Sequence, residues 1–184
     1  WGGVGNHEMV PVGETVVRPL GNRRYTEYQE GLYIGYRYFS TFGVPVRYPF
    51  GYGLSYTSFS REISDFAKTA DGITFAVSVT NTGSVPGKEV IQIYFHGAES
   101  ALERPDRELV AFQKTKLLAP GERETLVFSI PNRDLACYSE EKAAWLLQKG
   151  ENTLYIGGDS LNNEEFAVFE TQETILEQVS NQVT

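Results

Sequence analysis

Short runs of alternating apolar and polar residues, separated by turn signals, fill the sequence between residues 59 and 170. In Ile73–Thr80 (ITFAVSVT) every second side chain is apolar, and Asn81-Thr82-Gly83 follows as a turn. A period of two is typical of a strand that buries one face. Comparable runs are Glu89–Phe95, Leu109–Leu118, Glu124–Ile130, Ala143–Leu147, Asn152–Ile156 and Glu165–Phe169. This number and spacing of strands predicts a mainly β fold, an antiparallel two-sheet sandwich.

The two ends of the chain depart from this pattern. Residues 1–30 have little periodicity and predict a loop or extended linker. Residues 31–59 are dense in Tyr, Phe and Gly, which predicts an irregular, aromatic-rich extension whose rings pack against something. Helix is expected only at Leu135–Ala144 and Glu173–Thr184. The second segment has an apolar stripe at three- and four-residue spacing, formed by Ile175, Leu176 and Val179.

The charge of the chain argues against nucleic acid and membrane partners. The formal net charge is −8 and the pI is about 4.9, so the surface repels phosphate backbones and anionic lipid. No apolar run approaches the length of a membrane span. We expect a soluble protein; the compartment is not determined by the sequence, and the bacterial cytoplasm is the preferred expectation. The first residue is Trp1 rather than Met, which suggests a fragment of a longer protein.

The chain has too few cysteine and histidine residues to predict a metal site or thiol chemistry. Cys137 is the single cysteine, so no internal disulfide can form, and we interpret it as a small buried hydrophobic residue. His7 and His96 are far from it and from each other, so no metal site and no cofactor are expected. Asp106, Arg107 and Glu108 are interpreted as a solvated loop, and Trp145 as a core or sheet-packing residue.

Six blocks of sequence, in one order, resemble glycoside hydrolase family 3. The first two lie in the junction Glu30–Phe59 and read EGLYIGYRY at Glu30–Tyr38 and PFGYGLSY at Pro49–Tyr56. The others are VTNTG with GKEV and QIY between Val79 and Tyr94, RP with EL and FQK between Arg104 and Lys114, LAPGE at Leu118–Glu122, and RDL at Arg133–Leu135. One such block alone would carry no weight, but the ordered series on a matching strand pattern does.

The resemblance implies a domain organisation and a role. Residues 1–58 would be a junction that ends an α/β sandwich domain, 59–170 an immunoglobulin or fibronectin type III-like sandwich, and 171–184 a linker or tail. The chain would be an accessory, structural module of a β-glucosidase-like enzyme that hydrolyses terminal β-D-glycosides. Its partners would be the catalytic barrel and the α/β sandwich domain of the same parent, and the β-glucoside substrate would bind the parent only. Two alternatives are a carbohydrate-binding module and a protein–protein interaction domain.

Catalytic residues are not expected in this chain. The family's retaining mechanism uses two carboxylates about 5 Å apart, a nucleophile and an acid/base. The resemblance places the nucleophile in a Ser-Asp-Trp-like motif, which does not occur here. Glu8 and Glu14 are the upstream candidates for the acid/base, and neither lies in an acid/base context. The parent is therefore expected to be the enzyme, and this fragment alone to be inactive.

Candidate site residues lie in the junction, and each allows two interpretations. Arg37, seven residues after Glu30, could lie near a sugar or pair with a carboxylate at a domain seam; a structural ion pair or stacked guanidinium is the preferred interpretation. Aromatic rings there could stack on glucose, but core or interdomain packing is preferred. The substrate-proximal or domain-seam candidates are Glu30, Tyr33, Tyr36, Arg37, Phe50 and Tyr52. No catalytic residue and no metal ligand is expected in the chain.

The C-terminal segment suggests a particular domain order. About 15 residues follow the last expected strand, and their apolar stripe would have no use on a free end. In family members with swapped order, a linker of this kind leads to the barrel. We expect the parent to continue beyond Thr184 into that barrel, with residues 172–184 loosely held in this chain.

Overall fold

The computed structural model describes residues 30–100 and 102–180, so residues 1–29 of the expected junction and residues 181–184 of the expected tail lie outside it. The N-terminal part holds one short helix, α1 (Tyr36–Thr41). The strands are β1 (Phe59–Lys68), β2 (Gly72–Asn81), β3 (Val90–His96), β4 (Glu108–Lys114), β5 (Arg123–Pro131), β6 (Cys137–Ser139), β7 (Ala144–Leu147), β8 (Gly150–Gly157), β9 (Asn163–Thr171) and β10 (Thr174–Gln178). A short 3-10 turn, η1 (Asn132–Leu135), precedes β6.

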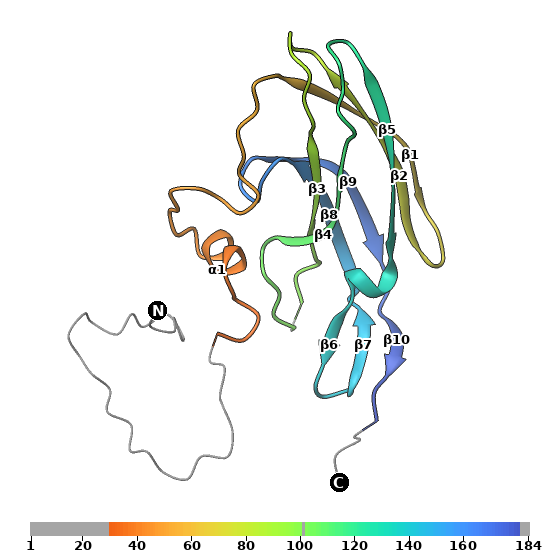
Figure 1. Cartoon of the computed structure of the whole chain (residues 1–184). Helices are drawn as coiled ribbons and strands as arrows, with labels where there is room; N and C mark the ends of the chain where they lie inside the picture. The colour runs from red at the N-terminus through yellow and green to blue at the C-terminus, as the bar shows by residue number, and fades with distance from the viewer. Residues whose placement is uncertain (1–29, 101, 181–184) are drawn as a thin grey trace, which may run out of the picture.

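Two antiparallel sheets face each other, as the alternating runs predict. One has the strand order β1-β2-β5 and the other β4-β3-β8-β9, and Figure 1 shows them as the two layers of a sandwich. Every second residue of β2 points into the core, and Ile73, Phe75, Val77 and Val79 are all buried. Ile91, Ile93 and Phe95 of β3 meet them from the opposite sheet. The fold class is confirmed, and all seven expected strands are present.

A third, small sheet with the order β10-β7-β6 extends the sandwich below β5 and β8 in Figure 1. It corrects both helix predictions within the described residues. The expected helix Leu135–Ala144 is instead the strand β6 and a turn. The expected C-terminal helix is β10, which pairs with β7 between Thr174↔Leu147 and Gln178↔Ala144. This part of the tail is held by a strand ladder rather than loosely.

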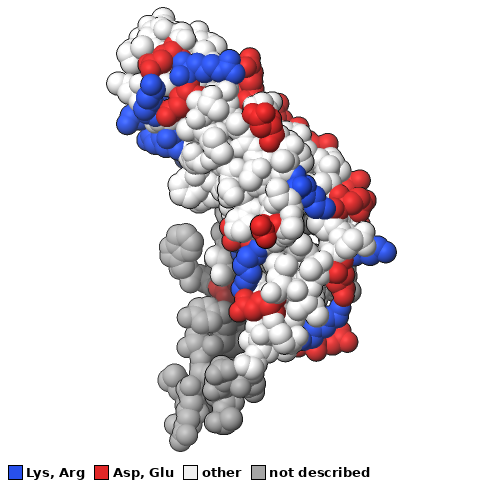
Figure 2. Space-filling view, turned by 90° about the vertical axis from the view of Figure 1, so that its right-hand side faces the viewer, with Lys and Arg blue, Asp and Glu red and all other residues white. Residues whose placement is uncertain are grey.

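The surface of the sandwich carries both signs of charge close together. Figure 2 shows acidic and basic side chains interspersed over one face. Surface ion pairs include Arg123 with Glu62 at 2.7 Å and Lys116 with Glu122 at 2.7 Å. Such pairs contribute little to stability and mainly keep the surface mixed. No helix of the described residues is long and apolar enough to cross a membrane.

Candidate functional site

The junction residues 30–56 form a layer outside the β4-β3-β8-β9 sheet, on the side away from β1-β2-β5 (Figure 1). Tyr36 at the start of α1 makes the central contact. Its ring stacks on Phe50 with centroids 4.7 Å apart and lies edge-on to Tyr94 of β3 at 6.1 Å. Its hydroxyl oxygen accepts a hydrogen bond of 2.8 Å from the backbone N–H of Leu109 in β4. One side chain thus ties the helix to two strands.

Beneath this layer, β3 carries two buried polar side chains on its outward face. Gln92 and Tyr94 alternate with the core residues of the strand, yet Tyr94 is 0% exposed. The Tyr94 hydroxyl donates to Gln92 Oε1 at 2.6 Å. Burial raises the pKa of Tyr94, with smaller contributions from Tyr36 and Asp159, so the phenol stays protonated. The outward face of β3 is therefore an inner surface, covered by the junction.

The Gln92 amide holds the junction backbone directly. Gln92 Nε2 donates to the carbonyl oxygens of Gly51, at 3.4 Å, and Gly158. Gly51 has a φ of 88°, and a Cβ there would overlap the Gln92 amide, so glycine is required on both counts. The backbone N–H of Ser160, after β8, donates to the Phe50 carbonyl at 2.9 Å. The strand β3 and the loop between β8 and β9 thus hold the Phe50-Gly51 turn.

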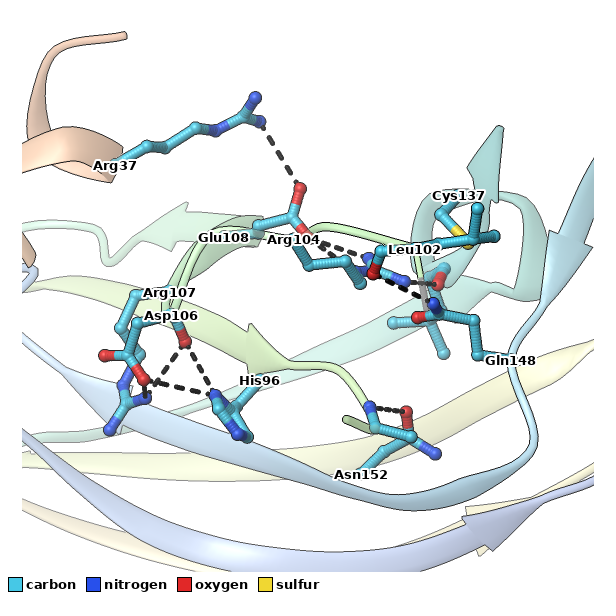
Figure 3. A network of polar contacts seen from close by, with 12 residues as sticks. Arg37, His96, Leu102, Arg104, Asp106, Arg107, Glu108, Cys137, Gln148 and Asn152 are labelled. Atoms are coloured by element: carbon cyan, nitrogen blue, oxygen red, sulfur yellow. Dashed lines mark hydrogen bonds and ion pairs between the residues drawn. The ribbon is translucent and has the colours of Figure 1, made fainter. Parts of the chain in front are cut away.

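A second contact joins α1 to the start of β4 through charge (Figure 3). Arg104 donates from Nε and Nη2 to Glu108 Oε2 at 2.9 and 2.7 Å, and from Nη1 to the Leu135 carbonyl at 2.8 Å. Arg37 of α1 approaches the other oxygen of Glu108 at 3.8 Å. The Arg104 and Glu108 side chains are only 9% and 18% exposed. Charges this deeply buried depend on each other for compensation.

The loop before β4 also fixes the C-terminal end of α1. The backbone N–H of Asp106 donates to Thr41 Oγ1 at 2.9 Å. The Asp106 carboxylate lies 3.2 Å from His96 Nδ1 and 2.8 Å from Arg107 Nη1 (Figure 3). The hydrogen bond between His96 and Asp106 raises the pKa of His96 and lowers the pKa of Asp106. Desolvation by burial opposes both shifts but is outweighed. Arg107 also lies over the Tyr155 ring at 3.7 Å. Asp106, Arg107 and Glu108 are thus half-buried partners, and their interpretation as a solvated loop is wrong.

The six candidate residues predicted from the sequence do not come together in one site. Tyr36 and Phe50 come together at the centre of the seam. Arg37 pairs with Glu108 rather than with Glu30, whose backbone carbonyl accepts the N–H of Tyr33 at 3.0 Å. The Tyr33 ring packs 5.1 Å from Phe42, and burial raises its pKa, with a smaller contribution from Glu103. Tyr52 lies apart, with its ring 5.1 Å from Tyr48.

The outer side of the junction is apolar and open. Its exposed large hydrophobic residues are Leu32, Ile34, Phe39, Tyr48, Phe50, Tyr52, Leu54 and Tyr56, which we call the junction face. A hollow of about 220 Å³ in this face is lined by residues of α1, the Tyr48–Phe50 stretch and Ser160-Leu161. Contiguous exposed apolar surface of this kind marks a binding surface. The junction thus has a tethered inner side and an exposed apolar outer side.

Tyr36 and Arg37 were identified from the sequence as seam residues, but Gln92, Tyr94, Arg104 and Thr41, which also hold the junction, were not. A signal does exist in β3, because Gln92 and Tyr94 alternate with the apolar residues Ile91, Ile93 and Phe95. Among the described residues, no group of three or more His, Cys, Asp or Glu side chains could hold a metal ion. Cys137 is half-buried, and burial raises its pKa.

Comparisons with known proteins agree on one group of enzymes. Residues 89–160 match the fibronectin type III-like domain family. The chain is 42% identical over 166 residues to a β-glucosidase of Ruminococcus albus, covering 86% of this chain and 17% of that protein. It is 38% identical over 141 residues to an exo-α-(1→6)-L-arabinopyranosidase of Bifidobacterium longum, covering 76% of this chain and 18% of that protein.

A solved structure with a similar fold is the GH3 β-glucosidase of Bifidobacterium adolescentis. The TM-score is 0.77 and the identity 32%, over 92% of this chain and 25% of that one. The chain therefore spans about a fifth of the length of the relatives it matches.

Proposed function

This chain is the fibronectin type III-like part of a glycoside hydrolase family 3 protein, and we propose that it serves its parent as an accessory module that docks through the junction face. In this proposal the parent hydrolyses terminal β-D-glycosides, and the module supplies a rigid platform rather than chemistry. The domain boundaries remain those expected from the resemblance, with a junction at 1–58, the sandwich at 59–170 and a tail at 171–184.

The observation that carries the proposal is the two-sided junction. Its inner side is fixed to β3 and β4 by Tyr36, Gln92 and Arg37, which leaves little freedom to rearrange. Its outer side exposes aromatic rings, of which Tyr56 is 102% exposed. A cluster of exposed rings on a rigid support has the character of an interface core, which buries large area at small entropic cost. We assign the catalytic barrel and the α/β sandwich domain of the parent as its partners.

The candidate residues take distinct roles in this proposal. Phe50 and Tyr52 face the partner domains, and Tyr36 and Tyr33 support them from below. Arg37 and Glu30 lie at the rim, where Arg37 joins the module's own Glu108. None of the six is assigned to sugar chemistry, because the parent's carboxylate pair lies outside this chain in the family resemblance.

The relatives support an accessory role in a further way. Proteins that carry this module at similar identity are named both as β-glucosidases and as arabinopyranosidases. A module shared between enzymes with different sugars does not determine which sugar is cleaved. Specificity is therefore assigned to the other domains of the parent.

An activity assay on the isolated 184-residue chain tests the absence of catalysis. The chain is incubated with an aryl β-glucoside, beside the full-length parent as the positive control. We expect release of the aryl alcohol at the uncatalysed rate from the chain and rapid release from the parent. Turnover by the chain well above the background would refute the accessory role.

A further inference from the structure

A groove lies between α1 and the β6–β7 hairpin, beside the junction face, with which it shares Leu32. Its volume is about 450 Å³, within the range of roughly 300–1,000 Å³ common for small-ligand sites. Leu32 and Arg37 of the junction line one side, Glu103 and Arg104 the middle, and the hairpin with η1 the other side. Three segments far apart in the sequence thus form one concave site.

The hairpin wall of the groove is aromatic. Tyr138 of β6 pairs across the strands with Trp145 of β7, and their rings lie 5.4 Å apart at 55°. The Arg133 guanidinium lies 3.7 Å from the Trp145 ring centroid and pairs with Glu177 of β10 at 3.3 Å. Trp145 is therefore held between Arg133 and Tyr138 in a fixed orientation. Tyr138 remains 40% exposed and offers the more open ring.

Several polar groups that line the groove have no partner among the described residues. The carboxylates of Glu103, Asp134 and Glu140 make no side-chain hydrogen bond or ion pair there, and neither does the indole N–H of Trp145. Arg104 and Glu108, by contrast, already satisfy each other. The groove therefore offers free acceptors and a free donor beside aromatic rings.

This combination selects a class of ligand. The lining is of mixed charge, with Arg37, Arg104 and Arg133 beside four carboxylates, so it has one carboxylate in excess and does not favour an anion. A purely apolar ligand would desolvate the carboxylates without compensation. A simple cation would use the carboxylates but leave the indole N–H unsatisfied. A sugar hydroxyl both donates and accepts, so it can satisfy both kinds of group, and the apolar face of a pyranose can pack on Tyr138. We propose that this groove binds a neutral oligosaccharide.

The sugar binding proposed here depends on the proposed function only for the choice of probe. We select cellotetraose and xylotetraose, neutral β-linked oligosaccharides, because the parent is proposed to act on β-glycosides. The full 184-residue chain is used with Trp1→Phe, which leaves Trp145 as its only indole. Titration calorimetry measures affinity, and indole fluorescence reports whether the sugar reaches the groove. Inactivity of the isolated chain, tested above, has no bearing on this result.

We expect binding of at least one of the two sugars at millimolar concentration, with a change in Trp145 fluorescence. Tyr138→Ala and the near-isosteric Asp134→Asn should each weaken binding by about tenfold, the loss of one stacking or hydrogen-bonding contact. Phe112→Ala is the matched control, because Phe112 is an exposed ring of β4 outside the groove. Absence of heat with both sugars, equal binding by all three variants, or equal weakening by Phe112→Ala would each overturn the proposal.

Discussion

At the scale of single residues, the junction depends on a few partly buried polar contacts. Tyr36, Gln92 and Arg104 each join segments separated widely in sequence. Buried polar groups cost free energy unless they are paired, so these contacts specify one position for the junction. Their roles could not be predicted from the sequence, because they depend on which segment covers the outward face of β3.

Tyr36→Phe isolates the first of these contacts. It keeps the ring stacked on Phe50 but removes the acceptor for the Leu109 N–H. A half-buried donor left unpaired should lower the free energy of unfolding by about 1–3 kcal/mol. Urea unfolding of the chain measures the change. Tyr56→Phe is the matched control, since that side chain is fully exposed, and an equal effect of both variants would contradict the assignment.

Glu108→Gln tests the charge contact in the same way. It leaves the Arg104 guanidinium, 9% exposed, without its counter-charge and weakens the approach of Arg37. We expect a loss of about 2–4 kcal/mol in the free energy of unfolding, near the range for a broken buried pair. Glu62→Gln should cost less than about 1 kcal/mol, because the Glu62–Arg123 pair lies at the surface. Similar losses in the two variants would show that burial of the pair is unimportant.

His96 and Asp106 make stability depend on pH in a defined direction. The pKa of His96 is raised above 6.5, so its contribution is full below that pH and is lost as pH rises through the folded-state value. The pKa of Asp106 is lowered below 3.8, so its contribution is present above that pH and is lost in stronger acid. The positive charge of Arg107 acts to lower the pKa of His96, but the hydrogen bond to Asp106 outweighs this effect.

The stability difference between the wild type and His96→Asn should therefore be largest between about pH 4 and 6.5 and shrink as the pH rises above that range. Chemical unfolding at a series of pH values gives this difference directly. A difference that stays constant or grows with rising pH would contradict the proton assignment.

At the scale of elements, the alternation of apolar residues predicted six of the seven strands of the two large sheets, and β7 of the small sheet. β1 was missed because its charged outer face and the irregularity between Ser64 and Ala67 disrupt the period of two. β10 was mistaken for helix because its apolar residues happen to fall at helical spacing. Tertiary pairing with the edge of β7 decides its conformation, and that edge is not visible in a local pattern.

Deletion of residues 173–184 tests the role of β10. Removal of its four residue pairs with β7 should lower the free energy of unfolding by roughly 1–4 kcal/mol, at about 0.2–1 kcal/mol for each pair. Thermal or urea unfolding of the shortened chain measures this loss. An unchanged stability would mean that the segment behaves as the free tail first expected from the sequence.

At the scale of the whole molecule, the chain is a sandwich with one side covered by its own junction. That junction in turn carries the apolar face assigned to the parent. The aromatic density of residues 31–59 correctly indicated packing, but only the structure separates the rings that face β3 from those that remain exposed. The proposed function rests on this division, in which the covered rings position the exposed ones.

We propose that the junction face docks on the other domains of the parent, and one paired measurement tests this claim. The triple variant Tyr48→Ser, Tyr52→Ser, Tyr56→Ser is made in the isolated chain and in the full-length parent, and thermal unfolding is followed in both. These rings are exposed in the isolated chain, so its melting temperature should hardly change. In the parent the same substitutions remove buried interface area, so the melting temperature and β-glucosidase activity should both fall. An unchanged parent, or an equal loss of stability in the isolated chain, would contradict the claim.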